Sequence, residues 1–247
     1  MGKREELIEE LRPILHNKEQ LEHYLVSNSN LPGPRSNLEL AFAFAELYED
    51  MDTLLEWLDI SAEQADVNHP RSFLAFCSAV CLGSVYVKTK KPEIIPILQR
   101  LANDQRWRMR EAVAFAFQSI GEHDFKVLQK IFSEWIKNSN NLEKRAILVA
   151  LAHPPFLNKD NVQFCFEMTE NILKQLDRTA DFEVLKKGLE FTISVFVAAD
   201  PENGFNFIEK WIGKNKTIDK ILEKNLKKNR LISKNSGKVK ELLNKIT

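Results

Sequence analysis

Apolar residues recur along the chain at spacings of three and four, which is the period of an amphipathic α-helix. Strand-like alternation is nearly absent, and glycine is scarce, with 8 among 247 residues. We therefore expect an all-α protein. The pattern predicts helices over 3–15, 18–27, 37–49, 51–60, 69–86, 91–103, 106–120, 123–137, 142–152, 160–176, 182–198, 202–213, 216–229 and 235–245.

Two polar or proline-containing segments indicate where helices start and end. In "PGPRSNLE" (32–39), Ser36 and Glu39 have the spacing of a capping box, which predicts a helix start. Pro154 and Pro155 predict a helix end, because proline cannot donate a backbone hydrogen bond and restricts the residue before it.

The predicted helices form pairs, and the second helix of each pair carries a basic residue. The intervals between these residues are 39, 35, 42 and then 33 or 37 positions. A period of about 40 residues with two helices per unit is typical of HEAT or armadillo arrays. The residues are Arg71, Arg110, Arg145, Lys187 and, less clearly, Lys220 or Lys224.

On this pattern the chain resembles the HEAT-like repeat superfamily over most of its length. The resemblance implies a right-handed α-solenoid of antiparallel helix pairs, as a single domain over 1–247. We expect an acidic N-terminal cap at 1–50, repeats over about 51–231 and a basic C-terminal helix at 232–247. The second helices of such arrays usually line a concave binding face.

Charge is distributed unevenly, although the formal net charge is zero. Residues 1–70 carry −10, residues 71–208 carry +2 and residues 209–247 carry +8. One interpretation is solvated helix faces, and another is a basic C-terminal end that meets phosphate. A third is that the acidic part meets a basic partner or the basic end of a second copy; the sequence leaves the oligomeric state open.

Several classes of chemistry and location are disfavoured. No apolar run reaches the ~18–20 residues that span a bilayer, and the N-terminus lacks an apolar signal core. Three cysteines form no disulfide framework, so we expect a cytoplasmic protein. Glycine-rich phosphate loops and metal-ligand spacings are lacking, so we expect no cofactor and no metal.

Other residues with reactive or aromatic side chains are expected in the core. Cys77 and Cys81 lie one turn apart in an apolar helix. Seven phenylalanines recur at helical spacing, which favours packing over ligand binding. They are Phe73, Phe76, Phe115, Phe117, Phe132, Phe164 and Phe166.

The stretch "DQRWRMREAVAFAF" (104–117) holds the candidate site. Trp107 and Glu111 are four residues apart and share a helix face, and Arg110 can flank the indole. An indole beside a carboxylate could bind a cation. The inward face is predicted to consist of Met109, Val113, Ala116 and Ile120.

Over 90–231 the chain resembles the bacterial DNA alkylation repair glycosylases built from HEAT-like repeats. Trp107 matches the first aromatic residue of that family, and Glu111 stands where the family usually has aspartate. Arg145, in "EKRAILVAL", matches the family arginine, and Phe191, in "LKKGLEFTI", falls where tryptophan is usual. The segment "KNLKKNRL" (224–231) looks like the basic end of relatives.

The resemblance implies excision of cationic alkylated purines by hydrolysis of the N-glycosidic bond. Glu111 would be the catalytic acid that stabilises the oxocarbenium-like centre and positions water, and Trp107 and Phe191 would contact the lesion's sugar or backbone. The other residues expected to bind DNA are Arg110, Arg145, Lys187, Lys224, Lys227, Lys228 and Arg230.

A structural alternative remains open for each of these residues. Trp107 could pack on the preceding helix, with Glu111 paired to Arg108 or Arg145. The recurrent arginines could bond turn carbonyls or Asp104. On this interpretation these residues bind no ligand. A second hypothesis for the function is a non-enzymatic scaffold that binds a protein partner on its concave face.

Overall fold

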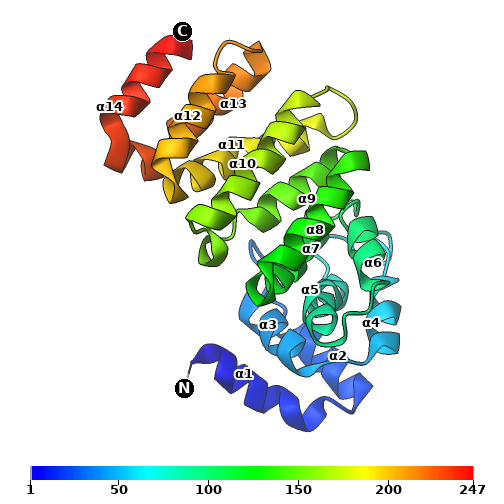
Figure 1. Cartoon of the computed structure of the whole chain (residues 1–247). Coiled ribbons are helices and arrows are strands. Elements are labelled where there is room, and N and C mark those ends of the chain that lie inside the picture. Colours follow the sequence, from blue (N-terminus) through cyan, green and yellow to red (C-terminus); the bar gives the residue numbers. More distant parts are fainter. Residues whose placement is uncertain (1, 247) are drawn as a thin grey trace. The chain divides into compact units, whose positions relative to one another are not determined.

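The computed structural model describes residues 2–246 and is all-helical over that range. Its contacts divide the chain after His123 into unit 1, Met1–His123, and unit 2, Asp124–Thr247. The fourteen α-helices of the described part correspond to the fourteen predicted ranges, which confirms the all-α class (Figure 1). The continuity of a single domain over the whole chain stays a prediction.

Unit 1 contains seven α-helices in two layers. Helices α1, α3, α5 and α7 pack on one another in that order, while α2, α4 and α6 pack against α5 or α7 from the other layer. The bounds are α1 Lys3–Leu11, η1 Arg12–Ile14, α2 Lys18–Ser27, α3 Leu38–Leu47, α4 Met51–Leu58, α5 Ser72–Thr89, α6 Ile94–Leu101 and α7 Trp107–His123.

Unit 2 repeats this arrangement. Helices α9, α11 and α13 pack in sequence, α8, α10 and α12 form the second layer, and α14 packs on α11 and α13. The bounds are α8 Phe125–Trp135, η2 Ile136–Asn138, α9 Asn141–Leu151, η3 Pro154–Phe156, α10 Lys159–Lys174, α11 Phe182–Ala199, α12 Pro201–Trp211, α13 Lys216–Leu226 and α14 Asn229–Ile246. The predicted boundary at 231 therefore falls inside α14, whose helical geometry breaks at Asn235.

Helix α5 is the central helix of unit 1. By length and composition it alone among the described helices could cross a membrane, but 72% of it is buried by the rest of the protein. Gly83 lets α7 approach closely, because a Cβ at this position would lie 2.4 Å from the carbonyl oxygen of Ala116. Cys77 and Cys81 are fully buried on α5, which confirms their predicted core position.

The predicted start of α3 is one residue off. Asn37, and not Ser36, caps the helix by accepting a hydrogen bond from the backbone N–H of Leu40 at 3.2 Å. Asn37 is fixed in this role because its own N–H and side-chain amide donate to the carbonyls of Ser29 and Asn28. The capping-box prediction for Ser36 and Glu39 is therefore wrong.

Candidate functional site

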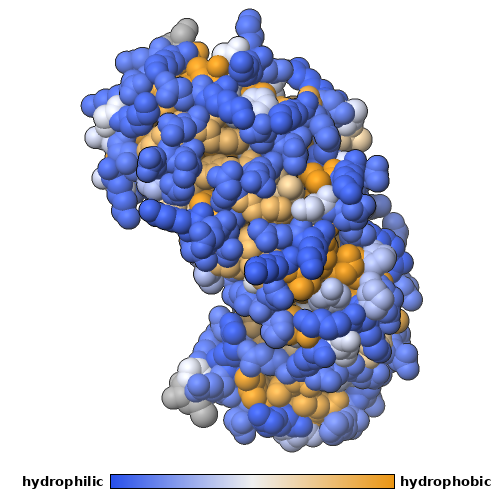
Figure 2. Space-filling model, in the orientation of Figure 1, coloured by the Kyte–Doolittle hydropathy of each residue, from blue (hydrophilic) through white to orange (hydrophobic). Residues whose placement is uncertain are grey.

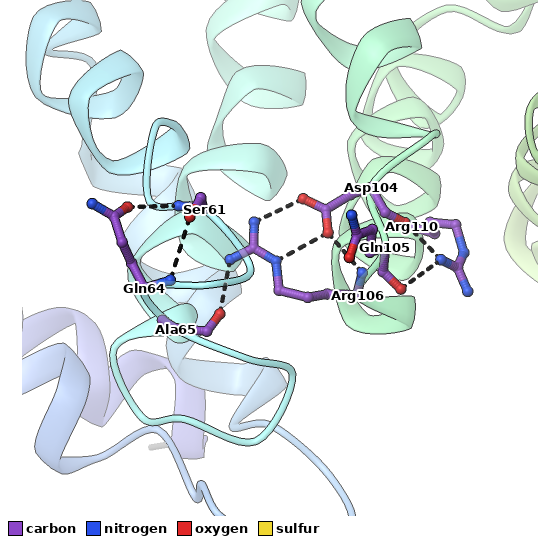
Figure 3. Close-up of polar contacts among 7 residues, drawn as sticks. All are labelled: Ser61, Gln64, Ala65, Asp104, Gln105, Arg106 and Arg110. Carbon is purple, nitrogen blue, oxygen red and sulfur yellow. Dashed lines mark hydrogen bonds and ion pairs between the residues drawn. The ribbon is translucent and has the colours of Figure 1, made fainter.

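The turn before α7 is a buried network of charge (Figure 3). The guanidinium of Arg106 donates to both carboxylate oxygens of Asp104, at 2.7 and 3.0 Å, and to the carbonyl of Ala65 at 3.2 Å. Arg106 is only 5% exposed. Since a buried charge needs a partner and hydrogen bonds, this network fixes the start of α7 against the loop that precedes α5.

Arg110 bonds the same turn from within α7. Its Nη1 donates to the carbonyls of Asp104 at 2.6 Å and Gln105 at 3.0 Å (Figure 3). These contacts match the structural alternative that the sequence left open for the recurrent arginines. The guanidinium that lies against Trp107 comes from Arg108 instead, so the predicted placement of Arg110 beside the indole is not observed.

Arg108 connects Trp107 to two loops of unit 1. Its guanidinium carbon lies 4.4 Å from the Trp107 ring centroid. It donates from Nε to the carbonyl of Val67 at 3.0 Å and from Nη2 to that of Gly33 at 2.5 Å. Burial lowers the pKa of Arg108 below its ordinary value. Hydrogen bonds to these backbone carbonyls therefore fix the guanidinium in its cation–π contact with the indole ring.

Trp107 is 45% exposed and lines a cavity of about 200 Å³ together with Glu111. Trp107 is therefore not a core residue, and the structural alternative for Trp107 and Glu111 stays open. The opposite face of α7 is buried as predicted, since Met109, Val113, Ala116 and Ile120 are at most 1% exposed.

Two phenylalanines complete the wall of this cavity. Phe76 and Phe115 both line it, and their ring centroids are 6.4 Å apart at 71°. Phe115 also meets Phe42 edge-on at 5.4 Å. Phe115 is only partly buried, so its predicted core position is wrong, whereas Phe76 is 3% exposed.

Unit 2 has its own exposed aromatic side chain. Phe191 on α11 is 44% exposed, and the guanidinium carbon of Arg230, from the start of α14, lies 4.9 Å from its ring centroid. The aliphatic stem of Arg145, on α9, packs against α11 at Gly188. A Cβ added to Gly188 would lie 3.1 Å from Arg145 Cγ. Unit 2 thus brings Arg145 and Phe191 to neighbouring packed helices.

Asn225 fixes α13 onto α11. Helix α13 contains Lys224, and Lys227, Lys228 and Arg230 follow it in the chain. Asn225 is fully buried, accepts a hydrogen bond from the Ser194 N–H at 2.8 Å, and donates to the carbonyls of Leu189 at 2.9 Å and Ile221 at 2.8 Å. Leu189 and Ser194 lie on either side of Phe191 in sequence. Asn225 therefore positions the segment from Lys224 to Arg230 beside Phe191.

The predicted basic set of unit 2 is partly engaged in ion pairs. Lys224 pairs with Glu190 at 2.9 Å and Lys227 with Glu223 at 2.5 Å. Both lysines remain 59% exposed, and pairs of this kind contribute little. Lys187 and Lys228 form no ion pair within residues 2–246, and Lys187 is exposed. All four ammonium groups can therefore meet a phosphate.

Sequence reasoning named Arg108 only as a partner for Glu111, not beside Trp107, and it missed Asn225 and the cavity wall. The repeat pattern indicated only Arg110, because the alignment takes one basic residue from each helix pair. Arg108 donates to carbonyls of loop residues that lie 41 and 75 positions earlier in the chain. No local sequence pattern encodes such contacts. Asn225 had one available signal: a polar residue on the buried face of an otherwise amphipathic helix.

No family model matches the chain, and no significant match to it is found among curated proteins or solved structures. The fold and the two aromatic sites described above are therefore the basis for assigning a function.

Proposed function

We propose that this protein is an α-solenoid of helix pairs that binds duplex DNA and is related to the alkylation repair glycosylases it resembles. One observation carries the proposal. Among residues 2–246 only three large apolar side chains are exposed, and two of them, Trp107 and Phe191, are the aromatics singled out by the resemblance. Each has a guanidinium against its ring.

The distribution of charge supports the same proposal. Residues 124–247 carry 22 Lys and Arg against 16 Asp and Glu, so unit 2 is +6, while residues 1–123 carry 13 against 19 and are −6. Arg145, Lys187, Lys228 and Arg230 all lie in unit 2 and would contact phosphates. Affinity for DNA should then fall steeply with salt.

Excision is the further step of this proposal. Glu111 would stabilise positive charge on the deoxyribose as the bond to a cationic purine breaks, and Trp107, from the same helix, would contact the backbone. Phe191 would offer unit 2 its own aromatic contact with DNA. Glutamate extends the carboxylate by one methylene relative to the aspartate usual in the family, and phenylalanine offers a weaker cation–π face than tryptophan.

The test is a titration with duplex DNA at ~50 mM and ~200 mM salt, where phosphate contacts should differ most. Binding that weakens by orders of magnitude between the two conditions is expected, and no binding at the lower salt would contradict the proposal. Release of N7-methylguanine or N3-methyladenine from treated DNA then tests excision. Equal release by wild type and Glu111→Gln would remove the catalytic role of Glu111.

The alternative is a scaffold that binds a protein partner. The surface in view in Figure 2 is mainly hydrophilic, with apolar areas over parts of both units. If the protein fails to bind DNA at both salt concentrations, this alternative is favoured.

A further inference from the structure

Unit 2 carries a buried carboxylate next to its exposed aromatic ring. Glu190 directly precedes Phe191 on α11, in a unit whose net charge is +6, and it is only 8% exposed. Burial of a carboxylate is costly unless the charge is paired, and negative charge near a phosphate weakens binding of that phosphate. The partners of Glu190 indicate what offsets both costs.

Two lysines lie near Glu190, and one of them is in close contact. Lys224, from α13, donates to Glu190 Oε2 at 2.9 Å. Lys186, four residues earlier on α11, lies 3.9 Å from Glu190 Oε1 and pairs more closely with Glu183, at 3.1 Å. Glu190 Oε1 is buried and makes no hydrogen bond with any described residue. The close contact of Glu190 therefore joins α11 to α13 through Lys224.

Lys224 is fixed on one side and open on the other. Its side chain is 59% exposed, although its ammonium group donates to a carboxylate that is 11% exposed. The next residue, Asn225, bonds α11 at Leu189 and Ser194, so the backbone that carries Lys224 is fixed as well. A flexible lysine loses side-chain entropy when it meets a phosphate, and the contact with Glu190 removes part of that loss in advance.

The neighbouring ion pair of Lys227 with Glu223 lacks these features. Lys227 is also 59% exposed, but Glu223 is 38% exposed and lies four residues earlier in the chain. Two exposed side chains do not define a single position for the ammonium group. The two pairs therefore offer the same charges, and only Lys224 is held by a buried acid from another helix.

We propose that Glu190 is a positioning residue for DNA binding, which presents the Lys224 ammonium group to a backbone phosphate beside the Phe191 ring. Glu190 acts through Lys224, because one carboxylate oxygen is buried and the other accepts from that lysine. Arg230, exposed and 4.9 Å from the Phe191 ring centroid, adds a second cation at the next position of α11. The inference rests on the proposed DNA binding and adds to it which phosphate contact the fold prepares.

The direction of the effect of Glu190→Gln tests this role. The substitution removes a negative charge, so an electrostatic effect alone would strengthen DNA binding. Loss of positioning predicts the opposite, namely binding that is several-fold weaker at ~50 mM salt and a slope of log affinity against log salt that is smaller by about 1. Titrations of the full-length protein with one duplex at several salt concentrations measure both quantities.

Glu223→Gln is the matched control. It makes the same change of charge beside a lysine of equal exposure, so affinity should stay equal or rise and the slope should stay unchanged. If Glu190→Gln behaves like Glu223→Gln, the positioning role of Glu190 is overturned.

A double-mutant cycle separates positioning of Lys224 from general support of the fold. Lys224→Gln alone should reduce the slope by about 1, and adding Glu190→Gln should then cause no further loss. Additive losses would mean that Glu190 acts independently of Lys224, which overturns the inference.

A second comparison applies if Glu190→Gln proves unfolded by circular dichroism. Lys224→Gln should then weaken DNA binding more than Lys227→Gln, because only Lys224 is held in place, and equal losses overturn the inference. Failure of the wild type to bind the duplex at ~50 mM salt overturns the proposed function itself.

Discussion

The two units present an exposed aromatic ring in the same way but support it differently. In unit 1, the guanidinium against Trp107 belongs to Arg108, which is 6% exposed and bonded to loop carbonyls. In unit 2, the guanidinium against Phe191 belongs to Arg230, which is exposed and bonded to no described carbonyl. The guanidinium beside the ring is therefore fixed by protein hydrogen bonds in unit 1, whereas in unit 2 it is available to a ligand.

This difference agrees with the opposite charges of the units. Unit 1, at −6, offers an aromatic cavity that is also lined by Arg35, Arg108 and Glu111, whereas unit 2, at +6, offers exposed cations around one ring. We therefore assign most phosphate contacts to unit 2 within the proposed function. Substitutions that change the free energy of unfolding without changing DNA binding, or the reverse, test this division.

The largest expected effect comes from the close helix approaches. A Cβ at Gly83 would lie 2.4 Å from a backbone oxygen of α7, and one at Gly204 would lie 2.6 Å from Val197 Cα. Because backbone cannot yield locally, Gly83→Ala should destabilise unit 1, and Gly204→Ala unit 2, by about 3 kcal/mol or more. Denaturant unfolding measures the loss.

Thiol labelling shows which unit has opened. Burial raises the pKa of the Cys77, Cys81 and Cys165 thiols, so each reacts only after local opening. Gly83→Ala should accelerate labelling of the two unit 1 cysteines, and Gly204→Ala that of Cys165. Acceleration of all three thiols by either variant would contradict separate stabilities.

Arg108 and Arg230 should differ in their effect on stability. Arg108→Gln removes charged hydrogen bonds from a buried guanidinium to the carbonyls of Val67 and Gly33, and should lower the free energy of unfolding by about 2 kcal/mol. Arg230→Gln changes an exposed side chain, and should stay within about 0.5 kcal/mol of wild type. Thermal unfolding of both variants decides the point, and equal losses would remove the distinction.

Arg230→Gln should instead affect DNA binding. Loss of one phosphate contact lowers the slope of log affinity against log salt by about 1, and weakens binding several-fold at low salt. Titrations at several salt concentrations measure the slope. Arg12→Gln, an exposed arginine of unit 1 that pairs with Glu9, is the matched control and should leave the slope unchanged.

A small effect of the opposite sign is expected at Gly237. A Cβ there meets no atom within 4 Å, and the residue lies within α14. Gly237→Ala should therefore stabilise unit 2 by about 0.5–1 kcal/mol, since alanine loses less backbone entropy in a helix. Destabilisation would mean that the break at Asn235 requires a flexible residue nearby.

Much of the secondary structure followed from the sequence. The predicted range 18–27 matches α2 at Lys18–Ser27, and the four residues predicted to face inward on α7 are buried. Both depend on hydrophobic periodicity, which is local. The helix start at 37–38 was predicted with the wrong cap, because Ser36 and Asn37 are both good capping residues. Loop contacts to Ser29 and Asn28 select Asn37.

The candidate site was predictable only in part. Trp107 and Phe191 were singled out by spacing and resemblance, and the structure leaves both exposed. The choice of Arg108 over Arg110 beside Trp107 could not be predicted. It depends on Gly33 and Val67, whose carbonyls come within reach only after α3, α5 and α7 have packed.

By itself, then, the sequence determined the helices, the residues they bury and the uneven distribution of charge, since these depend on neighbours within a few positions. Only the tertiary structure decided that Phe115 forms a cavity wall, that the Ser36 hydroxyl has no partner in the protein, and that Asn225 fixes α13 to α11. These features arise from contacts between segments tens of residues apart. Such contacts are settled by how whole helices pack and not by any local preference.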